Sequence, residues 1–385
     1  MSSSFVISQA RIFGPGGTAE TGALAVRDGR FTRPDDEAAG HHRYDAAGLL
    51  LLPGIVDLHG DAFERQIMPR PGVHFALDLA LADTDRQLVA NGITTAFHAV
   101  TWSWEPGLRS GKAARAMAEA LDQMRPRLLA DNRFHLRWET FALDAEPEVL
   151  DLLERGLIHL LAFNDHTPEI LRRVGSPKFT QYTERTGLQA DALKLLLDRV
   201  WSQRDQVPAA IERLAGAAAG AGVPLASHDD ESAEMRRSYR GIGCTLAEFP
   251  KTLDATDDAV AAGDTVIMGA PNVVRGGSHS NGIGAASMVR EGRCSVLTSD
   301  YYYPALLHAA FRLARDGICT LPKAWDLVSA NPARAAGLAD RGSLEAGKRA
   351  DFILVDDSDA ASPHIVATFV AGRPVYVNDR LRLAA

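Results

Sequence analysis

The sequence has few cysteines and no long hydrophobic run. Its 385 residues include three cysteines, Cys244, Cys294 and Cys319, which lie far apart and form no CxxC pair. This spacing indicates neither a disulfide framework nor a zinc site built from thiolates. No apolar run reaches the roughly 18–20 residues that a membrane-spanning helix needs. The first residues lack the basic and apolar regions of a secretory signal peptide, so we expect none.

Positive charge is also scarce. Lysine and arginine total 41 against 49 aspartates and glutamates, which gives a formal net charge of -8. Binding to nucleic acid relies on basic residues that neutralise phosphates, so this balance argues against such a partner. A content of 46% hydrophobic and 23% charged residues is typical of soluble globular proteins. We expect a cytoplasmic protein without a membrane or nucleic-acid partner, and leave open whether it forms a homo-oligomer.

The two ends of the chain differ from its middle. Short apolar runs between glycine-rich turns predict strands near both termini, and we expect residues 1–50 and 341–385 to form one small β domain. Residues 51–340 alternate short apolar runs with helical stretches such as 77–91. Repeated strand-then-helix units over about 250 residues predict a (β/α)8 barrel. A doubly wound sheet is the alternative, but no GxGxxG follows the first strand.

Ionisable side chains follow five of the predicted strands. In a (β/α)8 barrel the active site lies at the carboxyl ends of the strands, so these positions are candidates for chemistry. His59 and Asp61 follow the run 55–58, and their spacing puts both on one face of a strand. The other members of the set are Glu139, Asp165, His166, His228, Asp229, Asp230, Glu231 and Asp300. Buried charges of this kind need partners or a metal ion.

Each of these residues also has an ordinary structural interpretation. A single histidine at a strand end is more often a hydrogen-bonded turn residue than a metal ligand. An aspartate before a helix is usually an N-cap, and we keep this interpretation for at least one of Asp229 and Asp230. The whole constellation favours a divalent metal site. Imidazole and carboxylate without thiolate suit zinc, our first expectation, or manganese or iron. The ligands suffice for two ions bridged by Glu139, with Asp300 placed to hold the attacking hydroxide and carry its proton.

Three motifs resemble the amidohydrolase superfamily. Residues 52–59, LPGIVDLH, look like its first-strand signature, Asp300 like its last-strand aspartate, and residues 342–351, GSLEAGKRAD, like its return into a terminal β-sandwich. The resemblance implies a metal-dependent hydrolase on a (β/α)8 barrel, with a small β-sandwich built from both termini. It also implies a catalytic role for Asp300 as general acid and base. The implied metal ligands are His59, Asp61, Glu139, His166, His228 and Asp300.

A narrower resemblance rests on a variation of the first-strand motif. Most superfamily members have His-X-His there, whereas this chain has His59-Gly60-Asp61, followed by MPRPGV at 68–73. The variant is similar to the diphosphatase family of the carbon–phosphorus lyase pathway, which hydrolyses ribose 1-methylphosphonate 5-triphosphate to the 5-phosphate and diphosphate. Arginine forks and glycine amides suit the phosphates of such a substrate. The expected contacts are Arg70, Arg275, Gly276, Gly277, Ser278 and His279.

Two other functions stay open on the residues alone. The same metals could act on a C–N bond, as in a deacetylase, a cyclic amidase or a deaminase. Release of phosphate rather than of ammonia or an amine separates these reactions. The second alternative is a metal-binding scaffold that keeps the fold without turnover, and the complete ligand set argues against it.

Overall fold

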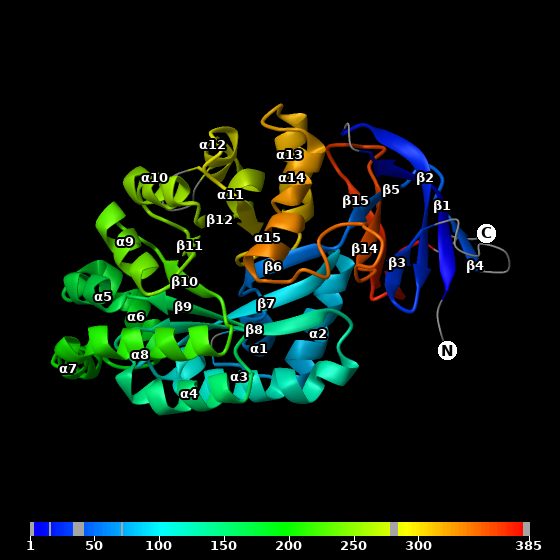
Figure 1. Cartoon of the computed structure of the whole chain (residues 1–385). Helices are drawn as coiled ribbons and strands as arrows, with labels where there is room; N and C mark the ends of the chain where they lie inside the picture. The colour runs from blue at the N-terminus through cyan, green and yellow to red at the C-terminus, as the bar shows by residue number, and fades with distance from the viewer. Residues whose placement is uncertain (1–3, 15–16, 34–41, 71, 278–283, 380–385) are drawn as a thin grey trace. The chain divides into compact units, whose positions relative to one another are not determined.

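The computed structural model describes residues 4–14, 17–33, 42–70, 72–277 and 284–379 (Figure 1). Eight strands hydrogen-bond in chain order into one sheet, β6-β7-β8-β9-β10-β11-β12-β13. Their bounds are β6 Ile55–Gly60, β7 Ile93–Trp102, β8 Asp131–Glu139, β9 Leu160–Asn164, β10 Leu225–His228, β11 Leu246–Glu248, β12 Thr265–Gly269 and β13 Val296–Thr298. Neighbours such as β8 and β9 or β9 and β10 are parallel, so the predicted (β/α)8 barrel is confirmed.

Helices follow the barrel strands along the chain. The α-helices are α1 Glu64–Ile67, α2 Leu77–Ala90, α3 Gly111–Met124, α4 Glu146–Glu154, α5 Thr167–Arg173, α6 Thr180–Thr186, α7 Ala190–Trp201, α8 Val207–Gly220, α9 Ala233–Gly241, α10 Leu253–Ala262, α11 Ala270–Arg275, α12 Ala285–Arg290, α13 Ala305–Arg315, α14 Leu321–Asp326 and α15 Ala330–Ala335. Short 3-10 turns lie at Gly107–Arg109, Arg125–Arg127, Leu143–Ala145, Pro177–Phe179 and Arg204–Gln206. Among the described helices, none combines the length and the apolar character needed to span a bilayer.

The residue pattern explains why these segments adopt their structure. All residues of β6, β7 and β9 are buried, as expected for parallel strands covered on both sides. In α3 the Ser110 hydroxyl accepts a hydrogen bond from the Ala113 amide at 3.3 Å, which caps the first turn. Met117, Leu121 and Met124 then recur at three- and four-residue spacing on its buried face.

The barrel closes where its first strand meets the segment after its last strand. Gly60 and Asp300 form a parallel bridge. The Asp300 amide donates to the His59 carbonyl at 2.9 Å, and the Asp61 amide donates to the Asp300 carbonyl at 2.9 Å. These bonds bring the backbones of three predicted site residues together.

Both termini build a second, mixed sheet. Its order is β16-β15-β14-β5-β1-β2-β3, and β4 also pairs with β1. The strands are β1 Phe5–Phe13, β2 Ala19–Arg27, β3 Arg30–Thr32, β4 His42–Asp45, β5 Leu50–Pro53, β14 Phe352–Asp356, β15 His364–Val370 and β16 Arg373–Val377. The antiparallel pairing of β14 with β5 joins the two ends of the chain (Figure 1). The predicted β domain from both termini is therefore confirmed.

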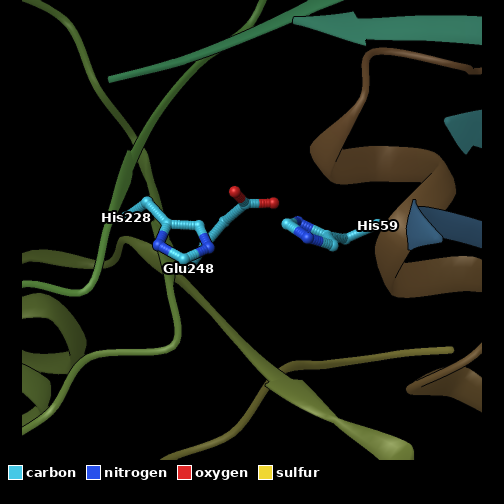
Figure 2. A group of neighbouring side chains, drawn as sticks. All are labelled: His59, His228 and Glu248. Atoms are coloured by element: carbon cyan, nitrogen blue, oxygen red, sulfur yellow. The ribbon is translucent and has the colours of Figure 1, made fainter. Parts of the chain in front are cut away.

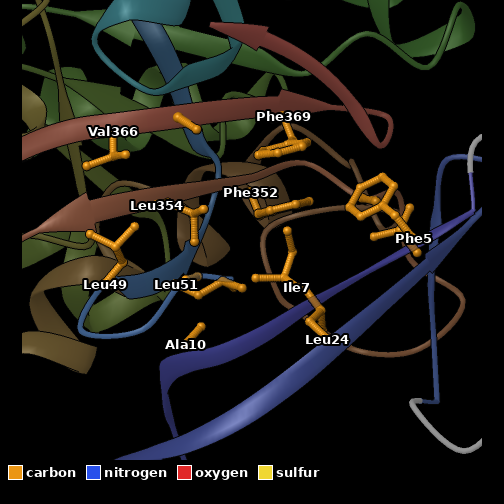
Figure 3. Close-up of a cluster of buried hydrophobic side chains, with 14 of the residues drawn as sticks. Phe5, Ile7, Ala10, Leu24, Leu49, Leu51, Phe352, Leu354, Val366 and Phe369 are labelled. Carbon is orange, nitrogen blue, oxygen red and sulfur yellow. The ribbon is translucent and has the colours of Figure 1, made fainter. Parts of the chain in front are cut away.

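The terminal sheet folds over its own hydrophobic core. In a flat sheet β3 and β14 would lie four strand spacings apart, roughly 19 Å. The rings of Phe31 on β3 and Phe352 on β14 nevertheless lie 5.9 Å apart between centroids. Phe352 also stacks on Phe369 at 4.3 Å, and Phe5 lies 5.6 Å from Phe369 (Figure 3). Such contacts require two layers, which is the arrangement of a small sandwich.

Two features of the middle segment differ from the sequence prediction. The apolar run 50–58 is not one strand: β5 ends at Pro53 and pairs in the terminal sheet, whereas β6 begins at Ile55 in the barrel. Strand β11 was missed because its three residues include no β-branched or aromatic side chain, unlike Val296 and Thr298 of the equally short β13. The predicted domain boundaries, 1–50 with 341–385 and 51–340, stay predictions.

Gly54 separates the two sheets and offers a test of this division. A Cβ at Gly54 would lie 2.3 Å from Thr94 Oγ1, which is fully buried. We therefore expect Gly54→Ala to lower the free energy of unfolding by about 1–3 kcal/mol in a urea titration. Gly216→Ala is the matched control, because a Cβ there meets nothing within 4 Å. It lies within α8, so alanine should stabilise the protein by about 0.5–1 kcal/mol. Equal changes in the free energy of unfolding for Gly54→Ala and Gly216→Ala would contradict the steric explanation.

Candidate functional site

The chain divides into two compact units. One contains Met1–Ala96, Arg127–Asn132 and Ile267–Ala385, and the other contains Phe97–Pro126 and Arg133–Val266. His59, Asp61 and Asp300 belong to the first unit, and Glu139, His166 and His228 belong to the second. The predicted ligands therefore form two groups.

The first group is anchored by a buried aspartate. Asp57 is completely buried and accepts hydrogen bonds from the Ser299 amide at 3.0 Å and the Ser299 hydroxyl at 2.5 Å. Its Oδ1 also lies 3.3 Å from the amide of His59, which donates to it. Burial raises the pKa of Asp57 to about 6, against the opposing effect of these donors. Asp57 thus ties β6 to the residue before Asp300.

The glycine between His59 and Asp61 is required by this packing. A Cβ at Gly60 would lie 2.8 Å from Asp57 Oδ2 and 3.0 Å from both Ser299 Oγ and Tyr303 Cε1. Real Cβ atoms essentially never come within 3.0 Å of another group, so any larger residue would displace a buried neighbour. The His59-Gly60-Asp61 spacing therefore reflects a close approach of β6 to the end of β13.

Asp300 has a strained backbone. Its φ of 54° lies in the left-handed region, which residues other than glycine rarely adopt. The two hydrogen bonds to His59 and Asp61 hold this conformation. Outliers of this kind are often retained where the side-chain direction matters for function.

The second group centres on a charged pair at the ends of β8 and β9. His166 Nδ1 lies 2.5 Å from Glu139 Oε1, and the His166 amide donates to Glu139 Oε2 at 3.2 Å. Burial would raise the pKa of Glu139, but the positive charge of His166 lowers it to about 2. The Glu139 carboxylate in turn raises the pKa of His166 to about 9. The Glu139 carboxylate thus favours a positive charge on His166, and a metal ion bound at this place would supply a positive charge as well.

Strand β10 adds a histidine and an aspartate to this pair. His166, His228 and Asp229 each offer one ligand atom, and these atoms lie within 4.8 Å of one another. The Asp229 carboxylate lies 3.4 Å from His166 Nε2 and 3.5 Å from His228 Nδ1. Asp229 also has a left-handed φ of 63°, and its amide donates to the Glu248 carbonyl at 2.9 Å. The donor set of imidazole and carboxylate fits a divalent ion.

The predicted N-cap role of Asp229 or Asp230 is wrong. Helix α9 is capped by Ser232, whose side chain accepts from the Met235 amide at 3.1 Å. A serine directly before the helix fills the cap position, which leaves Asp229 directed at the histidines. Asp230 instead accepts a hydrogen bond from the Ser227 hydroxyl at 2.6 Å.

Two residues near this group were missed by sequence reasoning. Glu248 is fully buried at the end of β11, and its ligand atom lies within 4.8 Å of that of His228 (Figure 2). Figure 2 also draws His59, which belongs to the other unit. Lys251 Nζ lies 3.6 Å from Asp229 Oδ2 and 3.3 Å from Glu231 Oε1. Recognising the short strand β11 would have exposed Glu248 as another carboxylate at a strand end.

A buried arginine supports the end of β10. Arg236 is 0% exposed and bonds to three segments of its unit. Its partners are Ser227 Oγ, Asp230 Oδ2 (3.1 Å), Asp264 Oδ2 (3.2 Å) and the carbonyls of Cys244 and Leu246 (3.3 Å). A buried guanidinium is tolerated only with such partners. The network therefore fixes the residues on either side of His228 and Asp229.

The predicted phosphate contacts are only partly described. Arg275 is exposed at the end of α11, and Arg70 is exposed after α1. The amides of Gly276 and Gly277 donate to the carbonyls of Val273 (3.2 Å) and Asn272 (3.0 Å), so they are engaged in ending α11. Gly276 has a φ of 83°, which suits glycine at a helix C-terminus. Ser278 and His279 lie outside the described residues.

Comparison with known proteins adds an independent line of evidence. Residues 50–377 match the amidohydrolase family. The chain belongs to this family. An alpha-D-ribose 1-methylphosphonate 5-triphosphate diphosphatase from Escherichia coli is similar at 34% identity over 356 residues. The match covers 88% of this amidohydrolase chain and 92% of the relative.

Solved structures share the fold of this amidohydrolase at low sequence identity. Phenylurea hydrolase B matches with a TM-score of 0.65 and 18% identity, over 99% of this chain and 98% of that one. A beta-aspartyl dipeptidase from Fervidobacterium islandicum matches with a TM-score of 0.61 and 14% identity, over 98% and 97%. At these identities the likeness is evidence for the fold alone. Amidohydrolases typically bind divalent metals, in agreement with the candidate ligand groups.

The Arg236 network can be tested by comparison with a neighbour on the same helix. Arg236→Met would leave Asp230 buried without its cation and Asp264 with Arg240 alone, and we expect the free energy of unfolding to fall by about 3–5 kcal/mol. Arg240→Met is the control, because Arg240 pairs with Asp258 and Asp264 but is 26% exposed. It should cost at most about 1 kcal/mol. Urea titrations of both variants measure the difference, and similar losses would contradict the assigned role.

Proposed function

We propose that this amidohydrolase cleaves a triphosphate ester and releases diphosphate, with ribose 1-methylphosphonate 5-triphosphate as the substrate. The observation that carries the proposal is the set of imidazole and carboxylate groups at successive strand ends. The 34% identity to the Escherichia coli diphosphatase supports the choice of a phosphorus substrate. The exposed Arg70 and Arg275 supply cations for its phosphates.

The proposed metal ligands are imidazole and carboxylate groups at the strand ends. They are His59, Asp61, Glu139, His166, His228 and Asp300. Zinc is our first choice and manganese or iron the others, because the donors are imidazole and carboxylate. Two ions would suit this number of ligands, with Glu139 between them. When bound, such ions activate water and stabilise the charge that develops on the phosphate oxygens. The pairing of His166 with Glu139 supports the fit, because a metal ion could replace the proton that lies between these two side chains.

Asp300 is the proposed general acid and base. Its backbone is fixed by hydrogen bonds to His59 and Asp61, so its carboxylate has a defined direction at the end of β13. In the proposed reaction Asp300 holds the attacking water and accepts its proton. The water oxygen forms a bond to the phosphorus nearest the ribose while the bond from that phosphorus to the bridging oxygen of the diphosphate group breaks. Diphosphate leaves with the proton that Asp300 returns to it, and the 5-phosphate remains on the ribose.

A metal analysis combined with a substrate panel tests the proposal. The purified protein should contain at least about one equivalent of divalent metal, and a chelator should abolish turnover until zinc or manganese is restored. The panel contains ribose 1-methylphosphonate 5-triphosphate, nucleoside triphosphates and amide or amidine compounds. Diphosphate release from the first supports the proposal. Ammonia or amine release would favour a C–N hydrolase, and bound metal without any hydrolysis would favour a scaffold.

Substitution of the proposed general base separates chemistry from metal binding. We expect Asp300→Asn to reduce kcat at least about 100-fold, because the amide cannot accept the proton, while most of the metal is retained. Metal content and diphosphate release are measured on the same preparation. Asp316→Asn is the control, because Asp316 is an exposed aspartate after α13, and its activity should be unchanged. Near-normal turnover in Asp300→Asn would show that another group carries the proton.

A further inference from the structure

Two guanidinium groups converge on the residue that follows Asp300. Arg65 Nη2 donates to the backbone carbonyl of Tyr301, and Arg275 Nη1 donates to the Tyr301 hydroxyl at 3.5 Å. Arg65 lies on α1, shortly after β6, and Arg275 is the last residue of α11, which follows β12. All three residues belong to the first unit. Loops from three barrel strands thus bring two cations to one tyrosine at the carboxyl ends of the strands.

The positive charges of these two arginines are not matched by acidic side chains. Within the described residues, neither Arg65 nor Arg275 forms an ion pair with a carboxylate. By contrast, Arg341 pairs with Asp131 at 2.7 Å, and Arg11 pairs with Asp357 at 2.7 Å. Two guanidinium groups that share one neutral partner repel each other, and a bound polyanion would remove that repulsion. Each group also keeps further N–H donors after its single contact.

We propose that Arg65, together with Arg275, binds the phosphate chain of the substrate, and that Tyr301 orients both guanidinium groups. This inference rests on the proposed function and adds Arg65 and Tyr301 to the proposed substrate contacts. The ligand class is a linear polyphosphate ester, because two guanidinium forks held at the two ends of one tyrosine can engage oxygens of different phosphates of one chain. Tyr301 is a positioning residue: its carbonyl holds Arg65 and its hydroxyl holds Arg275.

The first test measures anion binding without turnover. Inorganic diphosphate is titrated into the metal-loaded protein by calorimetry, and the metal content is checked afterwards. We expect Arg65→Met to weaken binding about 10- to 100-fold, the usual range for loss of a charge-assisted hydrogen bond. Arg65→Lys should recover part of the affinity, because it keeps the charge without the fork. Arg373→Met, at an exposed arginine on β16, is the control and should bind like the unmodified protein.

The second test separates the two contacts of Tyr301. Tyr301→Phe removes the hydroxyl that holds Arg275 but keeps the carbonyl that holds Arg65. Its loss of diphosphate affinity should disappear when Arg275→Met is already present and should persist when Arg65→Met is present. In turnover assays Arg65→Met should raise KM for the triphosphate much more than it lowers kcat, with metal content unchanged.

Specific outcomes overturn the inference. Unchanged diphosphate affinity in Arg65→Met with normal metal content would show that Arg65 does not bind phosphate. If Tyr301→Phe lowered the diphosphate affinity equally in the Arg275→Met and Arg65→Met backgrounds, Tyr301 would not be the residue that positions Arg275. Diphosphate binding is measured without catalysis, so the inference and the proposed function can fail separately. If diphosphate binding needed Arg65 but the protein hydrolysed no triphosphate, only the proposed function would be wrong.

Discussion

The contact that closes the barrel determines the candidate site. Gly60 and Asp300 form a parallel bridge, and the amides and carbonyls of His59, Asp61 and Asp300 are joined by two hydrogen bonds of 2.9 Å. Because peptide hydrogen bonds have a narrow range of length and angle, they set the relative positions of these three side chains. Beside this contact, the side chains of Asp57, Ser299 and Tyr303 leave no room for a Cβ at Gly60. The glycine of the motif therefore depends on side-chain packing, and the left-handed conformation of Asp300 is held by the backbone hydrogen bonds.

A second constraint is the need to neutralise buried acid groups. Glu139 is 4% exposed and pairs with His166, whereas Asp230 is 1% exposed and pairs with Arg236. These pairs differ in kind. Arginine keeps its charge at any ordinary pH, so its pair with Asp230 is permanent and structural. Histidine can lose its proton, so a metal ion bound by His166 and Glu139 can replace that proton. The buried carboxylates thus separate into a supporting network and a ligand group.

The barrel and most of the candidate site could be predicted from the sequence because apolar runs and strand-end polar residues are local signals. His59, His166 and His228 lie at or within two residues of the ends of strands that are rich in apolar residues. Glu139 ends β8, in which the apolar residues Phe134, Leu136 and Trp138 alternate with polar ones. Glu248 was missed because its short strand β11 contains no β-branched or aromatic residue that would mark it as a strand.

The remaining differences arise from contacts between segments far apart in the chain. Whether the run 50–58 is one strand or two depends on its distant partners: the Gly54 amide donates to the Asp351 carbonyl, whereas the Ile55 amide donates to the Gly92 carbonyl. The role of Asp229 depends on which residue caps α9, and Ser232 competes for that position as well as any aspartate does. Similarly, a glycine-rich stretch after Arg275 is equally compatible with a phosphate cradle and a helix end. The amides of Gly276 and Gly277 donate to carbonyls at the end of α11, and the phosphate contact stays a prediction.

The net charge of -8 is a poor guide to the local electrostatic potential that an anionic substrate would meet. Many acidic groups are already matched by an arginine, as Glu105 is by Arg185 and Glu146 by Arg213. Such pairs cancel at short range and contribute little to the local potential. Arg65 and Arg275, in contrast, meet at the neutral Tyr301, so their charges add. Since interactions between exposed charges fade within about 10 Å at ordinary salt, an approaching phosphate responds to this pair rather than to the acidic total.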